Sequence, residues 1–158
     1  MSTCVSIDET RRELRSAYQI DGCNVDELLE DVYQTCWSKA AVRGLDLRPE
    51  LIAWQPIHAA ADAGALRGLL STAVHHVACN TEEGAIHLRA FPSHDDVYVV
   101  FEVQNEKPAR RRSDRLDDFT RMMARARLEV ESMGGELAEF ATEDGGSRVC
   151  FRLPQWVC

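Results

Sequence analysis

Residues 129–154, EVESMGGELAEFATEDGGSRVCFRLP, hold two glycine pairs that divide the end of the chain into a helix and two strands. Glycine commonly ends a helix, and it accepts the backbone angles of tight turns. We therefore predict that a helix ends at Gly134-Gly135 and that strands over 137–141 and 149–153 flank a turn at 143–146. This helix has one apolar face, which consists of Phe119, Met122, Met123, Ala126, Val130 and Met133.

Two segments further upstream alternate apolar and polar residues with the period of a strand. Residues 86–91 and 97–103 each show this period-two pattern, and a turn cluster at 92–96 separates them. We predict that the two segments form an antiparallel hairpin. Residues 45–57, which two prolines interrupt, form a shorter extended segment nearer the N-terminus.

Two more helices precede the hairpin. Asn24 can cap the first one with Glu27 as its capping-box partner, and Gly44 is placed to end it. Asp62 can cap the second helix, and Glu83-Gly84 ends that region. Both segments repeat apolar residues at helical spacing, so each helix has one face to bury.

These elements predict an α+β fold. Helices that gather on one face of a sheet bury the apolar side of both layers at once. The sequence therefore predicts a two-layer sandwich with three main helices packed on one face of a mixed, mostly antiparallel sheet. We place an N-terminal helical extension at 1–20 and the domain itself at 21–158.

The composition excludes several classes of protein. A length of 158 residues suits one domain, and the net charge of −8 argues against a nucleic-acid binder, which presents a basic face to phosphates. No stretch approaches the roughly 20 apolar residues of a membrane span, and the start lacks the apolar core of a signal peptide. We expect a cytoplasmic protein. Its six cysteines form no CxxC pair, so we expect mostly free thiols.

The order of the elements and three local phrases resemble the ATP-binding domain of sensor histidine kinases over about residues 20–154. Residues 24–44, NVDELLEDVYQTCWSKAAVRG, are similar to the opening helix of that family. Residues 58–70, HAAADAGALRGLL, resemble the segment in which a strand ends and the second helix begins. Residues 129–154 resemble the closing helix, strand, glycine turn and strand. The resemblance implies a helix-covered sheet.

The resemblance also implies a nucleotide site, but this chain departs from the family at its motifs. The family motif NLLSNA supplies asparagines for magnesium and phosphate, whereas residues 68–73 here are GLLSTA. The strand-end aspartate that bonds the adenine amino group is replaced by Asn105, and Lys107 and Ala109 replace two glycines that let the backbone approach the nucleotide. The short connection to the third helix lacks the glycine-rich lid of the family.

We therefore expect a vestigial nucleotide pocket with no catalytic residue and no cofactor, ATP with magnesium included. The resemblance assigns to this pocket Gly68, Thr72, His75, His76, Asn105, Lys107 and Ala109. The leading hypothesis is a non-catalytic protein-interaction module in two-component-type signalling. Its partner would be a kinase, a receiver domain or a second copy of the chain in a homodimer. An atypical ATP-binding histidine kinase domain stays open as the alternative.

Two residue groups carry the remaining hypotheses. The basic residues Arg110, Arg111, Arg112 and Arg115 form either a solvated loop or a docking patch for an acidic surface such as that of a receiver domain. Cys79 lies one helical turn after His75 and His76, which suggests a metal- or redox-sensing domain as a second alternative. A zinc site needs three or four ligands, and the sequence offers no second cluster. The three tryptophans are expected to pack in the core and at its edge.

Overall fold

The computed structural model describes residues 22–108, 116–141 and 147–156. The predicted helical extension over 1–20 lies outside this range. The bounds of the three helices are α2 Val25–Val42, α3 Ala63–Cys79 and α4 Leu116–Ser132. The bounds of the strands are β1 Gly22–Asn24, β2 Leu45–Leu51, β3 His58–Ala60, β4 Thr81–Pro92, β5 Tyr98–Pro108, β6 Glu136–Ala141 and β7 Ser147–Pro154.

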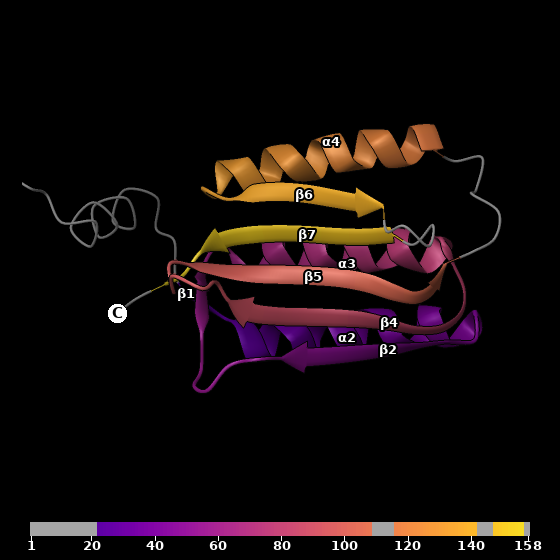
Figure 1. The fold of residues 1–158 in the computed structure, drawn as a ribbon, viewed down its shortest axis with the longest axis horizontal. Helices are drawn as coiled ribbons and strands as arrows, with labels where there is room; N and C mark the ends of the chain where they lie inside the picture. The colour runs from indigo at the N-terminus through magenta and orange to yellow at the C-terminus, as the bar shows by residue number, and fades with distance from the viewer. Residues whose placement is uncertain (1–21, 109–115, 142–146, 157–158) are drawn as a thin grey trace, which may run out of the picture.

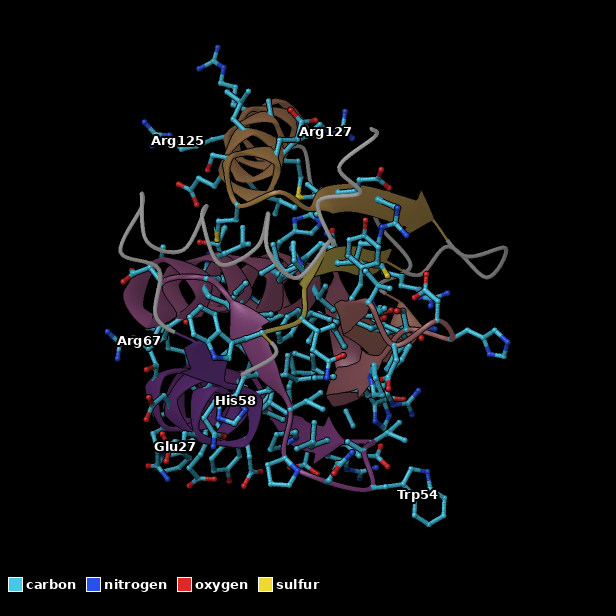
Figure 2. The ribbon with its side chains drawn as sticks, turned by 90° about the vertical axis from the view of Figure 1, so that its left-hand side faces the viewer. Glu27, Trp54, His58, Arg67, Arg125 and Arg127 are labelled. Atoms are coloured by element: carbon cyan, nitrogen blue, oxygen red, sulfur yellow. The ribbon has the colours of Figure 1, made fainter. Side chains whose placement is uncertain are left out.

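The predicted α+β sandwich is confirmed. A five-stranded sheet has the order β2-β4-β5-β7-β6, in which β2 runs parallel to β4 and the other neighbours are antiparallel. In Figure 1 the sheet lies in front of α2 and α3, and α4 runs along the β6 edge. The side view in Figure 2 places all three helices on the same side of the sheet. The predicted hairpin is the β4–β5 pair.

Both predicted helix caps are present. The side chain of Asn24 accepts a hydrogen bond from the backbone N–H of Glu27 at 3.1 Å, and the side chain of Asp62 accepts one from Ala65 at 2.9 Å. Gly44 follows α2 with a φ of +73°, a left-handed conformation that glycine adopts without strain. Each cap satisfies a backbone N–H in the first turn of its helix.

The boundary predicted at Glu83-Gly84 is wrong, because β4 already begins at Thr81. Its pairing with β5 changes register between Thr81 and Ile86, and Gly84 has a φ of +97° in this stretch. Such a bulge lets a strand continue past an irregular residue when its neighbour can still pair with it. The strand therefore follows α3 almost at once.

A second, two-stranded sheet was not predicted. Residues 45–57 are not one extended segment, since β2 ends at Leu51 and β3 begins at His58 and pairs antiparallel with β1. The backbone N–H of Trp156 donates to the carbonyl of His58 at 2.7 Å, which joins the last described residues to this sheet. The small sheet therefore fixes the starts of α2 and α3.

The core lies between the helices and the sheet. The rings of Phe101 and Phe151 stack there with centroids 5.1 Å apart. The expectation that all tryptophans pack is wrong for Trp54, whose exposed fraction is 105% (Figure 2). The exposed fraction of Trp37 is 47%. The four cysteines within the described ranges are free thiols, as expected. None of the helices seen there is long and apolar enough to cross a membrane.

Candidate functional site

Three of the predicted pocket residues follow one another along the same side of α3. Gly68, Thr72 and His76 are spaced four residues apart, so their positions lie above one another on the helix. Gly68 is exposed, and a Cβ built on it meets no heavy atom within 4 Å. Thr72 is half-buried, and His76 is 8% exposed. This side of α3 therefore changes from open surface to buried polar interior along its length.

A polar network begins where this side of the helix ends. The side-chain amide of Asn105, in β5, donates to the carbonyl oxygen of Asn80 at 3.2 Å. Asn80 Nδ2 lies 3.2 Å from His76 Nε2 and donates to the carbonyl oxygen of His76 at 3.3 Å. Thr81 closes the helix end through a 2.6 Å hydrogen bond from its hydroxyl to the carbonyl of Val77. The network ties the end of α3 to strand β5.

His76 is held in its neutral form. Burial lowers the pKa of His76 from 6.5 to about 4, with a smaller contribution from the neighbouring His75. A ring nitrogen that accepts from the Asn80 amide must carry a lone pair, which the neutral imidazole has and the imidazolium lacks. The network and the burial therefore favour the same protonation state.

His75 lies apart from this network. It is exposed, and its Nε2 atom is 3.8 Å from the sulfur of Cys79. The same sulfur accepts a hydrogen bond from Nη1 of Arg43, the residue directly after α2, at 3.6 Å. The two adjacent histidines thus have different surroundings, and only His76 joins Asn80 and Asn105.

The geometry brings two of the three proposed metal ligands together. His75 and Cys79 are neighbours, whereas His76 lies against Asn80. Within the described ranges, no three His, Cys, Asp or Glu side chains gather as they would around a metal ion. Two ligands fall short of the three or four that hold zinc. For the redox version of this hypothesis, this pair offers one half-buried thiol, that of Cys79.

The remaining predicted residues are placed only in part. The backbone of Lys107 pairs with Glu83 in the β4–β5 ladder. Ala109 lies outside the described residues, and so do the four arginines of the predicted docking patch, Arg110, Arg111, Arg112 and Arg115. The sequence analysis missed Asn80 and Thr81. The sequence signal that could have identified them is a pair of polar residues directly after an apolar helix face, where the chain continues into a strand.

The α4 helix presents basic side chains to solvent. Arg121 and Arg125 are exposed one turn apart, and Leu128, a further turn along, is 68% exposed. Figure 2 shows Arg125 and Arg127 extending from opposite sides of this helix. The opposite face of α4 packs on the sheet through Met123, Ala126 and Val130. We call the exposed residues Arg121, Arg125 and Leu128 the α4 face.

Comparison with known proteins identifies the fold. No protein-family model matches the chain, and no curated protein matches it either. Among solved structures, the catalytic domain of histidine kinase ThkA matches with a TM-score of 0.68 and 18% identity, over 85% of this chain and 96% of that one.

Two larger solved structures contain the same fold. Full-length ShkA in complex with AMPPNP matches with a TM-score of 0.68 and 20% identity, over 88% of this chain and 32% of that one. ThkA in complex with the response regulator TrrA matches with a TM-score of 0.66 and 19% identity, over 92% of this chain and 46% of that kinase. The chain therefore has the fold of a histidine-kinase catalytic domain.

Proposed function

We propose that this chain is a non-catalytic relative of histidine-kinase catalytic domains that acts as a protein-interaction module in two-component-type signalling in the cytoplasm. The observation that carries the proposal is the hydrogen bond from Asn105 to Asn80, at the position where the family reads adenine. Gly68 and Thr72 also support the proposal, because they replace the two asparagines with which the family holds magnesium and phosphate.

The α3 side of the pocket offers little to a magnesium ion. Magnesium requires oxygen ligands in near-octahedral geometry, and the family supplies them from two asparagines. Gly68 has no side chain, and Thr72 contributes one neutral hydroxyl. Neither residue supplies the amide oxygen that the family's asparagines offer to a metal-bound phosphate.

Asn105 and Asn80 form a bond that an aspartate could not form. Asn105 uses an N–H of its amide to reach the Asn80 carbonyl, whereas an ionised aspartate is only an acceptor. The adenine amino group is a donor and needs an acceptor such as that carboxylate. The same residue change that joins strand β5 to the end of α3 therefore puts a neutral amide where the family has a carboxylate.

We expect magnesium-ATP at millimolar concentration to leave the melting temperature of this chain unchanged. A ligand at a hundredfold excess over its Kd stabilises by about 2.7 kcal/mol, which shifts the melting temperature of a domain this size by roughly 5–10 °C. Differential scanning fluorimetry measures the shift, with ShkA as the positive control because its solved structure holds AMPPNP. A saturable shift with magnesium-ATP, absent with magnesium alone, would establish the alternative of an atypical ATP-binding domain.

The partner proposal rests on the α4 face. Arg121 and Arg125 follow the arginines at 110–115 after a five-residue segment, LDDFT, so several of the basic residues of this acidic chain lie within residues 110–125. ThkA has been crystallised with a response regulator, which indicates protein partners of this kind for the fold. Complementary charge mainly raises the association rate and sets specificity. We propose that the α4 face and the preceding arginines bind the acidic surface of a receiver domain.

Reversing the charge of the α4 face should slow this association. For Arg121→Glu/Arg125→Glu, we expect an association rate about tenfold lower at low salt, with a smaller difference at high salt. Biolayer interferometry against a panel of purified receiver domains measures the rates. Arg67→Glu, an exposed arginine on α3, is the matched control and should retain most of the wild-type rate. A receiver that binds wild type and the double variant equally fast would contradict the assignment of the surface.

A further inference from the structure

A cavity of about 310 Å³ lies between the C-terminal halves of α2 and α3. Its walls are mainly apolar and include the buried side chains of Ala40, Val74 and Ala78. Of the α3 residues that line it, Ser71, Val74 and Ala78 lie on a different side of the helix from Gly68, Thr72 and His76. His75 also lines the cavity, so the cavity borders the predicted nucleotide pocket at that residue.

The wall of this cavity contains a hydroxyl without a partner. Ser71 lines the cavity, and its Oγ atom is buried and makes no hydrogen bond within the described part of the chain. Most buried polar atoms in proteins are paired, and a serine inside a helix usually bonds the carbonyl four residues before it. An unpaired hydroxyl at a cavity wall marks a place where a bound molecule can supply the missing hydrogen bond.

The rim of the cavity carries two cations. Lys39, in the last turn of α2, and Arg43, directly after the helix, both line it. Neither forms an ion pair with any residue that the structure describes. Arg43 donates to the sulfur of Cys79 through Nη1, which leaves several N–H donors of the guanidinium for another acceptor. In a chain with a net charge of −8, two cations without an ion pair to the described residues, beside an apolar cavity, favour an anionic ligand.

We propose that this cavity binds a small organic anion with an apolar body, such as a medium-chain carboxylate. The carboxylate would pair with Lys39 and Arg43 at the rim and accept a hydrogen bond from the Ser71 hydroxyl. The apolar body would fill the space between Ala40, Val74 and Ala78. Ligand cavities start at about 300 Å³, so the volume suits a molecule of roughly ten non-hydrogen atoms. The inference does not depend on the proposed signalling function, because no part of the site is shared with the α4 face or the polar network.

Sodium octanoate is the probe for this site, and octanol is its neutral counterpart of equal chain length. We expect isothermal titration calorimetry to show one octanoate per chain with a Kd on the order of 0.1–1 mM. Octanol should bind about tenfold more weakly, because it cannot pair with the two cations. Equal affinity for the two probes would overturn the proposal. So would the absence of saturable octanoate binding up to 10 mM, about ten times the upper limit of the expected Kd.

Three variants test where octanoate binds. Lys39→Gln/Arg43→Gln should weaken octanoate binding about tenfold and leave octanol binding unchanged. Ala78→Leu fills the cavity and should abolish the binding of both, with its melting temperature showing that it still folds. Arg125→Gln, at an exposed position on α4, is the matched control and should bind like wild type. An affinity for octanoate that neither cavity variant changes would contradict the site.

Sedimentation of the full chain tests whether a second copy of the chain covers the cavity instead. We expect the sedimentation coefficient to be the same for wild type and Ala78→Leu, with or without octanoate. A dimer that Ala78→Leu or octanoate dissociates would mean that a second copy covers the cavity, and the ligand proposal would then fail.

Discussion

Lowering the pH from 7.5 to 4.5 should reduce the free energy of unfolding by about 2.5 kcal/mol through His76 alone. The pKa of this ring is lowered to about 4 in the folded protein, against 6.5 for an exposed histidine. Between these two values the unfolded chain binds a proton that the folded chain does not, so stability falls as the pH falls. The loss begins near pH 6.5 and levels off below pH 4.

Urea unfolding at several pH values between 4.5 and 7.5 measures this effect. His76→Gln removes the titrating group but keeps a polar side chain near Asn80, so the part of the pH dependence that His76 causes should disappear. His75→Gln is the matched control, because His75 is the adjacent residue of the same type and is exposed. It should keep most of the slope. A wild-type slope that His76→Gln leaves intact would show that other groups cause it.

This prediction also bears on the candidate site. Protonation of His76 would give the ring a donor at the atom that now faces the Asn80 amide, and the network to Asn105 would lose one of its contacts. Strand β5 and helix α3 are joined by this network. We therefore expect acid to loosen the end of α3 before the rest of the domain unfolds.

The elements that local sequence determines were predicted, and those that depend on distant partners were not. Asn24 and Asp62 cap helices through atoms three residues away, so the sequence alone indicates both starts. The early start of β4 depends instead on β5, which pairs with it from Thr81 onward across a bulge. The three-residue strands β1 and β3 are too short to show an alternating pattern.

The candidate site was predictable only where residue types carry the information. Gly68, Thr72 and Asn105 stood out because the resemblance assigns chemistry to those positions. The partner of Asn105 is a backbone carbonyl, which every residue possesses, so the sequence could not single out Asn80. Trp54 shows the same limit for burial, because a large apolar side chain can still be fully exposed.

Replacing Gly135 by alanine should destabilise the domain by about 3 kcal/mol. A Cβ at this position would clash with the carbonyl oxygen of Arg152 and lie 2.8 Å from a methyl carbon of Leu153. The carbonyl belongs to strand β7, whose Arg152 pairs with Val100 on one side and Glu136 on the other. The neighbour is therefore backbone held in the sheet, and it cannot move aside as a flexible side chain would.

The same glycine pair ends helix α4. Gly134 has a φ of +80°, and the backbone N–H of Gly135 donates to the carbonyl of Val130 at 2.9 Å, the arrangement of a Schellman cap. The chain then turns directly into β6 against β7. Gly134→Asn should be tolerated better than Gly135→Ala, because asparagine accepts the left-handed conformation and the surroundings of Gly134 are less crowded.

Gly68→Ala is the matched control, since it adds the same methyl group within α3, where the structure leaves open space. Alanine is the better helix former, so we expect this variant to gain about 0.5–1 kcal/mol. Urea midpoints with unchanged m-values measure both variants. The gain would show that Gly68 is not required by the fold. A Gly135→Ala variant whose free energy of unfolding is within 1 kcal/mol of wild type, less than half the expected loss, would contradict the close approach of α4, β6 and β7.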